Sequence, residues 1–227
     1  MKKLFSVICI FSSLLLSGQN DIGSSNIKDG YKATRDGVKG HPFFLEEWVV
    51  GYGIMPDSSL TQPEMFNYDI HQNNLTYRTG EGANDIMIVN NESLIGFILK
   101  DKGGDQTFLK INKQHFDKNK KENKFYLVLD PSTKYVILEP VKKLDDPNVS
   151  GWSASSSNTK SAEYDYKENL YILNGDHKFV LIKLNKSSVL NALKDKRSDI
   201  SNFISSKNID LDDPKDLIPI MHFYHNR

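Results

Sequence analysis

An acid and a histidine lie close together in the sequence, at Asp69 and His71, and could do chemistry as a pair. They alternate with Phe66, Tyr68 and Ile70, and a period of two is typical of a half-buried strand. If the three apolar side chains face inward, the carboxylate and the imidazole both face outward. There they could form an acid–base or metal-binding pair, or simply a solvated strand edge. Both residues are candidate ligand-binding residues.

Trp152 is a third candidate, because it lies in a Ser- and Asn-rich stretch, residues 145–160. A large aromatic side chain in such a connection either packs back onto the sheet or stays exposed to stack on a ligand. The surrounding residues 151–155 (GWSAS) resemble a nucleophile elbow, but they lack its final glycine and the strand and helix that must flank it. We therefore expect a loop here and assign no catalytic residue.

Signatures of metal and cofactor sites do not occur in the sequence. There is no phosphate-binding loop, no dinucleotide-binding glycine pattern, no H-E-x-x-H and no calcium loop. His222 and His225 are three apart near the C-terminus, where cationic residues also suit a helix dipole. We therefore predict no metal and no cofactor. The sequence does not decide whether two carboxylates form a hydrolytic pair. Such a pair needs a distance of about 5 to 10 Å in space, and this distance does not follow from spacing in the sequence.

The N-terminus has the arrangement of a cleaved secretory signal. Lys2 and Lys3 precede an apolar run, residues 4–16, and small or polar residues follow it. The run is too short for a membrane-spanning helix of about 20 residues. We predict cleavage after Gly18, which also removes Cys9, and a flexible segment over residues 19–41. The mature protein is then expected in the periplasm or outside the cell, with no stable membrane span.

Composition narrows the function classes further. The chain has 227 residues, 38% of them hydrophobic and 11% aromatic, which indicates one globular domain and argues against disorder. Its 29 basic and 29 acidic residues balance, whereas a nucleic-acid-binding protein should show a marked basic excess. We expect no nucleic acid partner.

Short alternating runs dominate residues 42–184. Asn, Gly and Pro clusters separate them, which favours hairpins between consecutive strands, and no connection shows the helical period that a parallel sheet requires. We predict a mainly β (α+β) fold: a curved antiparallel sheet or a partly open barrel of about ten strands. The runs are residues 48–55, 66–70, 75–78, 85–89, 94–100, 107–111, 125–129, 135–141, 163–166, 170–173 and 179–184.

The apolar period changes after residue 184, so residues 185–227 are predicted to form two or three short helices. Apolar residues then recur three and four apart, as in Val189, Leu190 and Leu193, which places a stripe on one helix face. Asp213 is a plausible N-cap for the last helix. Pro219 is expected to lie beyond the first turn of that helix and to kink or shorten it.

Several segments stand out by their order along the chain. They are residues 42–45 with Trp48 and Gly51, residues 66–69, 125–129 and 135–138, and the tail with Ile200, Phe203, Ile204, Lys207, Ile209, Leu211, Leu217 and residues 224–226. Together they resemble a family of uncharacterised exported proteins of Gram-negative bacteria. The family typically has an Arg-Tyr-Asn or Tyr-Asn element where this chain has Phe-Asn-Tyr-Asp, so the match there is one of sheet position. The resemblance implies an exported, sheet-rich protein with short C-terminal helices, and no catalytic residue is carried over.

Three functional hypotheses follow. The first is a non-enzymatic exported protein that binds an envelope component, such as a glycan, or another protein through its sheet surface. The second is a secreted hydrolase that uses carboxylates, which predicts acids converging in a concave pocket with at least one raised pKa. The third is an immunity or inhibitor protein for a secreted toxin, which predicts one long acidic face.

Overall fold

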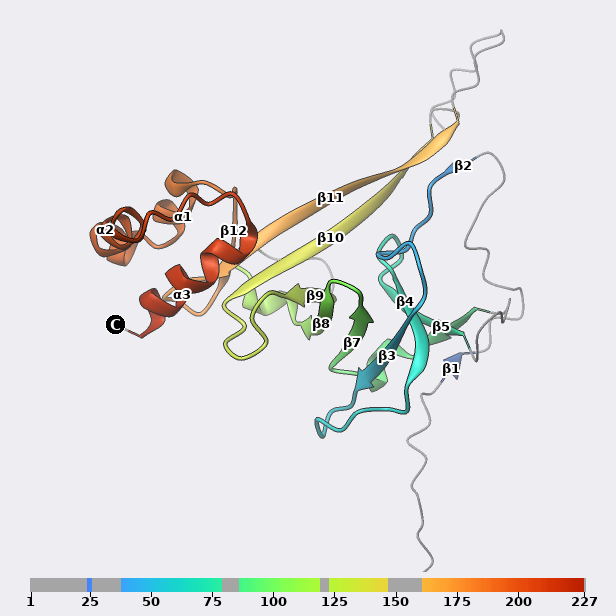
Figure 1. Ribbon diagram of the computed structural model, residues 1–227. Coiled ribbons are helices and arrows are strands. Elements are labelled where there is room, and N and C mark those ends of the chain that lie inside the picture. Colours follow the sequence, from blue (N-terminus) through green and yellow to red (C-terminus); the bar gives the residue numbers. More distant parts are fainter. Residues whose placement is uncertain (1–23, 26–37, 79–85, 119–122, 147–160, 227) are drawn as a thin grey trace, which may run out of the picture.

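The computed structural model describes residues 24–25, 38–78, 86–118, 123–146 and 161–226 (Figure 1). Over these residues the protein is mainly β, with α-helices only near the C-terminus. The strands are β1 (Ser24–Ser25), β2 (Val38–Lys39), β3 (Val49–Ile54), β4 (Glu64–Asp69), β5 (Asn74–Arg78), β6 (Met87–Val89), β7 (Gly96–Asp101), β8 (Gly104–Ile111), β9 (Lys124–Val128), β10 (Val136–Asp145), β11 (Ala162–Leu173) and β12 (Phe179–Ile182). The helices are η1 (Asn91–Ser93), η2 (Lys113–His115), α1 (Lys186–Ala192), η3 (Lys194–Lys196), α2 (Arg197–Lys207), η4 (Pro214–Asp216) and α3 (Leu217–His225).

One open sheet contains the described strands, in the order β1-β6-β5-β4-β3-β7-β8-β9-β10-β11-β12. Neighbours on this path pair antiparallel, and β2 adds a parallel pairing with β11, so the sheet is mixed. The two outermost strands, β1 and β12, do not pair, so the sheet is not closed into a barrel. The predicted mainly β fold with short C-terminal helices is therefore confirmed.

Two runs of consecutive hairpins make up this sheet. Strands β3 to β6 form one run and β7 to β12 form the other, and they meet where β3 pairs with β7. Close contact at this junction requires glycine: a Cβ atom on Gly51 would lie 2.6 Å from the carbonyl oxygen of Ile98 on the paired strand. The glycines of the predicted first strand thus permit a close backbone approach.

Strand β11 is one long element, although the sequence suggested two separate strands. Its polar middle residues, such as Asp165 and Lys167, are exposed and continue the ladder with β10 through the pairing of Lys167 with Val141. Figure 1 shows this part of the β10–β11 hairpin extending away from the rest of the sheet. Because both faces of this part of the strand contact solvent, no alternation of apolar residues marks it.

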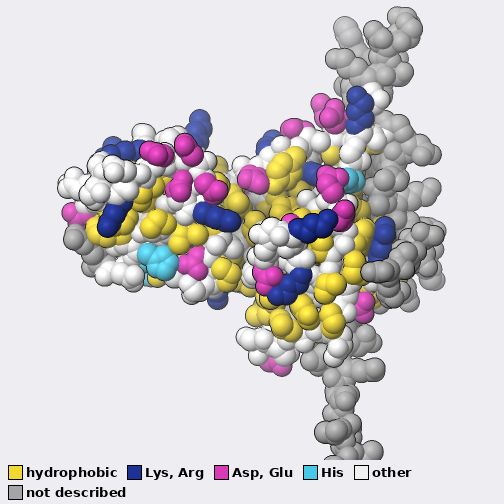
Figure 2. Space-filling view, viewed as in Figure 1, with side chains coloured by type: hydrophobic (Ala, Val, Ile, Leu, Met, Phe, Trp, Pro, Cys, Tyr) yellow, Lys and Arg dark blue, Asp and Glu magenta, His cyan; other side chains and the backbone are white. Residues whose placement is uncertain are grey.

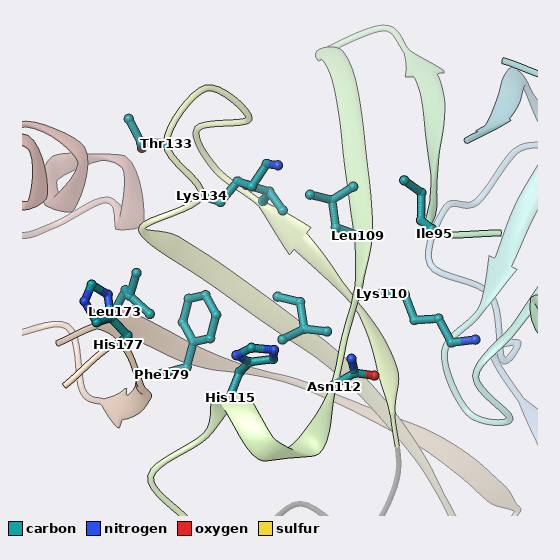
Figure 3. A pocket seen from close by; sticks show the side chains of 12 residues that line it. Ile95, Leu109, Lys110, Asn112, His115, Thr133, Lys134, Leu173, His177 and Phe179 are labelled. Atoms are coloured by element: carbon teal, nitrogen blue, oxygen red, sulfur yellow. The ribbon is translucent and has the colours of Figure 1, made fainter. Parts of the chain in front are cut away.

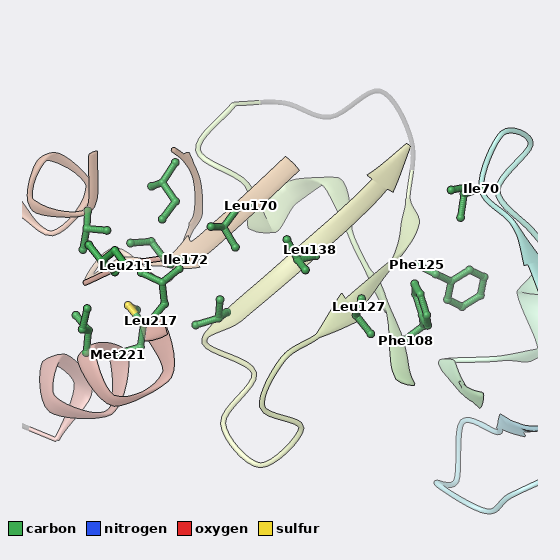
Figure 4. Close-up of a cluster of buried hydrophobic side chains, with 14 of the residues drawn as sticks. Ile70, Phe108, Phe125, Leu127, Leu138, Leu170, Ile172, Leu211, Leu217 and Met221 are labelled. Carbon is green, nitrogen blue, oxygen red and sulfur yellow. The ribbon is translucent and has the colours of Figure 1, made fainter. Parts of the chain in front are cut away.

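The larger hydrophobic core lies on one face of the sheet, and the α-helices cover only a part of it: Figure 4 shows Phe108, Phe125 and Ile70 away from the helices. Alternation along each strand sends Phe108, Leu127 and Leu138 to this face, where they join a continuous buried cluster. Buried side chains of the helices, including Leu193 and Leu217, complete the cluster. The helices are therefore held by apolar packing against strands of the second run.

The final helix differs from expectation at its start. A capping box joins Asp213 and Asp216 around the short helix η4, and α3 begins directly afterwards at Leu217. Pro219 therefore lies in the first turn of α3, where its missing N–H group would have no intrahelical partner. The prediction that Pro219 lies beyond the first turn is wrong, because α3 begins later than its apolar pattern suggested.

No described helix combines the length and the apolar character that a membrane crossing requires.

Candidate functional site

A groove of about 500 Å³ lies on the face of the sheet opposite the large core (Figure 3). Its floor consists of alternate residues of four strands: Leu109 of β8, Val128 of β9, Leu173 of β11 and Phe179 of β12. None of the described α-helices contributes to the hydrophobic cluster on this face. The described lining residues are Ile95, Leu109, Lys110, Ile111, Asn112, His115, Val128, Thr133, Lys134, Leu173, His177 and Phe179.

The segment after β8 forms a wall of this groove. Helix η2 carries His115 into the lining, and the next residue, Phe116, inserts against the sheet. The Phe116 ring centroid lies 5.0 Å from that of Tyr126 and 5.2 Å from that of Tyr171. These aromatic contacts cover the neighbouring part of the face and leave the groove beside them open.

Two tight turns bring basic side chains to the rim. Lys134 follows β9 and His177 follows β11, and both have left-handed backbones, with φ of 60° and 56°. The Asn174 side chain accepts hydrogen bonds from the backbone N–H groups of Asp176 and Lys178 at 3.1 and 3.0 Å, and it thereby closes the turn that holds His177. These turns are polar, yet each contributes a basic side chain to the lining of an apolar groove.

The turn that carries Lys134 is organised by Asp130. Its carboxylate accepts hydrogen bonds from the Ser132 hydroxyl at 2.6 Å and the Thr133 hydroxyl at 2.8 Å, and from the other side it meets Nε2 of His222 in α3 at 2.8 Å. The Ser132 hydrogen bond and those of His222 and Thr133 hold the pKa of Asp130 well below its usual range. The charge of Asp130 is thus engaged inside the turn and with the helix, and Asp130 does not line the groove.

Basic groups outnumber acids around this groove, since Lys110, Lys134, His115 and His177 line it and no described lining residue is acidic. Lys110 is already neutralised, because its ammonium lies 3.1 Å from Glu92 and donates to the carbonyl oxygen of Asn91 at 3.2 Å. An apolar floor with a few polar groups at its rim, in a volume between about 300 and 1,000 Å³, is typical of a small-molecule site. The arrangement can bind a ligand.

Asp69 does not face outward as the sequence suggested, because it is completely buried. The segment around Pro42 and Phe43 crosses this end of β4: Ile70 N–H donates to the Pro42 carbonyl at 3.1 Å, and Phe43 forms a bridge with Asp69. One carboxylate oxygen of Asp69 accepts from the backbone N–H groups of His71 and Gln72, both at 2.9 Å. Asp69 therefore shapes the β4–β5 turn, and burial raises its pKa in spite of these hydrogen bonds.

His71 is exposed as predicted, but its ring does not meet the Asp69 carboxylate. Its Nδ1 lies 3.1 Å from the carbonyl oxygen of Lys142 in β10, and the ring packs edge-on to Tyr164. Lys142 in turn donates from Nζ to the Phe43 carbonyl at 2.6 Å. The two predicted partners thus stabilise the contact between β10 and the end of β4, and they form no joint site.

Trp152 lies outside the described residues. His222 and His225, the other pair singled out in the sequence, have separate partners: His222 meets Asp130, and Nε2 of His225 lies 3.0 Å from the carbonyl oxygen of Leu173. Over the described ranges, no group of three His, Cys, Asp or Glu residues is arranged to hold a metal ion.

The groove residues were missed at the sequence level. Leu109, Val128 and Phe179 were recognised as strand residues, but alternation alone does not say which of the two faces stays open. The Asn, Gly and Pro clusters between the strand runs predict turns before residue 135 and before residue 179. A left-handed backbone at a lysine or a histidine has no sequence signature.

Comparisons of the chain with protein-family models, curated proteins and solved structures gave no match. The resemblance to an exported family therefore stays a prediction.

The burial of Asp69 leads to a prediction about pH. The pKa of Asp69 is raised in the folded protein, so folding favours the neutral carboxyl. The protonated carboxyl therefore adds to the free energy of unfolding, and this contribution is complete below the unfolded pKa of about 3.9. The contribution is lost as the pH rises through the folded pKa. The amide that replaces this carboxyl in Asp69→Asn does not titrate. We therefore expect the stability of the wild type relative to Asp69→Asn to increase as the pH is lowered from about 7 to about 4.

Urea unfolding of both proteins across this pH range measures the difference. The matched control is Asp57→Asn, because hydrogen bonds from Ser59 lower the pKa of the exposed Asp57. In this comparison, the wild type should lose stability relative to Asp57→Asn as the pH falls toward about 4. A constant difference between wild type and Asp69→Asn would contradict the expected titration.

Proposed function

We propose that this protein is an exported, non-enzymatic binding protein that takes up an amphiphilic envelope component in the groove between Leu109 and Phe179. The observation that carries the proposal is an apolar floor of about 500 Å³ on a sheet face to which no described α-helix contributes, with cations at its rim. Exposed or half-buried apolar residues on such a floor gain from contact with a ligand because they leave water.

The scale of the groove favours a small ligand over a protein partner. A stable protein interface buries about 800 Å² on each side around a contiguous apolar centre. The large apolar side chains that are exposed in the described residues do not form one such surface, because they come from separate parts of the sheet: Val50, Leu60, Ile95, Tyr166 and Leu181. Figure 2 shows acidic and basic side chains interspersed on the viewed face, without one long acidic surface there.

The hypothesis of a carboxylate-dependent hydrolase has less support than that of a binding protein. The pKa of Asp69 is raised, but this residue is completely buried and does not line the groove. A carboxylate-dependent hydrolase instead needs acids that reach the substrate from the wall of a concave site. No described acidic side chain lines the groove.

Binding of Nile red, a neutral apolar dye whose fluorescence reports burial, tests the proposal. We expect saturable binding to the wild type and at least a tenfold loss in Leu109→Trp, because filling the floor removes roughly 60 Å² of apolar contact, worth about 1.5 kcal/mol. Leu109 is partly exposed, so the larger ring extends into the groove.

Leu181→Trp is the matched control. Leu181 lies on β12 and is 52% exposed, but it does not line the groove, so its variant should bind the dye as the wild type does. Equal dye binding by Leu109→Trp and the wild type would overturn the proposal, as would the lack of any saturable binding. Recovery of a stoichiometric protein partner that leaves dye binding unchanged would also count against it.

A further inference from the structure

We infer that the groove selects single-chain amphiphiles with an anionic head group, bound with the chain on the apolar floor between β8 and β12 and the head beside Lys134. The inference rests on the proposed function and specifies its ligand. The ligand has one alkyl chain, and its anionic head group is a carboxylate or a phosphate.

The charge distribution along the groove places the head group. Figure 3 shows Ile95 and Lys110 at one end and Leu173 and His177 at the other, with Lys134 extending from beside Thr133 toward Leu109. The Lys110 ammonium is paired with Glu92, so its end carries little net charge. No described lining residue is acidic, so an anionic head gains most beside Lys134.

The acid in the turn that carries Lys134 is directed away from the groove. Asp130 does not line the groove, and its carboxylate is held by its own turn and by His222 in α3. The rim beside Lys134 thus keeps its positive character.

The backbone at the rim supplies an independent observation. Lys134 and His177 both occupy the left-handed region, which a residue with a Cβ atom rarely adopts and which glycine adopts readily. Strained backbones of this kind gather at ligand clamps, where the side chain that they present has a role. At both turns the residue that bears the strain also presents a basic side chain to the groove.

The length of the floor suits one extended chain. The groove crosses from β8 to β12, which are four positions apart in the sheet order. At about 4.8 Å between neighbouring strands, this is a path of about 19 Å. A single dodecyl chain can lie on the floor within this length, with its head group beside Lys134.

The test compares four dodecyl amphiphiles below their micelle concentrations, by displacement of Nile red. Dodecanoate and dodecyl phosphate carry anionic heads, dodecyl maltoside is neutral and dodecyltrimethylammonium is cationic. We expect the wild type to bind at least one anionic probe about tenfold more tightly than the neutral one, and the cationic probe most weakly. The two anionic probes distinguish a carboxylate preference from a phosphate preference.

Glycine substitution separates charge from folding. Lys134→Gly removes the cation and relieves the left-handed strain, so we expect an unchanged or higher melting temperature together with a three- to tenfold weaker affinity for the anionic probe, an approximate range for one partly exposed ion pair. Affinity for dodecyl maltoside should stay the same. Lys134→Gln, which keeps a side chain of similar shape, should weaken anion binding to the same extent.

Ser58→Gly is the matched control, because Ser58 has the same left-handed backbone, with φ of 68°, in the β3–β4 connection away from the groove. It should leave all four affinities unchanged. This inference would be overturned by equal affinity for neutral and anionic probes, or by unchanged anion binding in both Lys134 variants. In either case, saturable binding of Nile red would still support the proposed function. Failure of Nile red to bind would overturn the proposed function itself.

Discussion

Replacement of Phe108 by alanine is expected to lower the free energy of unfolding by about 3–5 kcal/mol. The Phe108 ring is completely buried and stacks on Phe97 with centroids 4.7 Å apart. It also meets the rings of Tyr68 and Phe44 edge-on, each at 5.2 Å. Because strands from both hairpin runs contribute to this aromatic group, the cavity would lie where they join, and neighbouring rings cannot easily collapse into it.

Urea unfolding followed by circular dichroism measures this loss. Leu181→Ala serves as the control, because Leu181 is 52% exposed and its truncation should change stability by less than about 0.5 kcal/mol. A loss below about 1 kcal/mol in Phe108→Ala would show that the aromatic group does not hold the two runs together.

Glu139 is the second position where a large effect is expected, because its carboxylate is buried on the groove side of the sheet. It is 6% exposed and accepts hydrogen bonds from the Tyr171 hydroxyl at 2.8 Å and the Asn169 amide at 3.1 Å, with the Lys124 ammonium at 3.9 Å. Removing one partner of a buried charged network leaves the remaining groups uncompensated. We expect Glu139→Ala to lower the free energy of unfolding by about 3 kcal/mol.

Glu139→Gln separates the hydrogen bonds from the charge. Its amide oxygen can still accept from Tyr171, so the variant should lose only about 1 kcal/mol. Both variants are compared with the wild type by the same urea titration. If Glu139→Gln were as destabilising as Glu139→Ala, the charge rather than the hydrogen bonds would dominate, and the hydrogen-bond interpretation would be wrong.

Most strands could be predicted because one face of each is apolar. The run at residues 48–55 corresponds to β3 (Val49–Ile54), and residues 125–129 correspond to β9 (Lys124–Val128). The distal part of β11 could not be recognised, since its exposed polar residues follow no apolar period. Alternation reports contact with a core, and this hairpin end has none.

The candidate site was harder to predict than the strands, for two physical reasons. Alternation assigned Asp69 to the solvent side, but the segment around Pro42, distant in sequence, covers that side as well. The groove depends on Leu109, Val128 and Phe179 coming together across strands that the sequence does not align by itself. Pairing register and turn conformation decide this, and neither leaves a local sequence signal.

The junction of β3 and β7 has a consequence for how the molecule reaches its native state. Nearly every strand pairs with its neighbour along the chain, so each hairpin can close over a short loop soon after its residues become available. The contact between Gly51 and Leu99 is different, because the whole first hairpin run must be spanned before it forms. We expect this closure, which joins the two hairpin runs, to set the refolding rate, and mutations along that seam to slow refolding more than mutations in the outer hairpins.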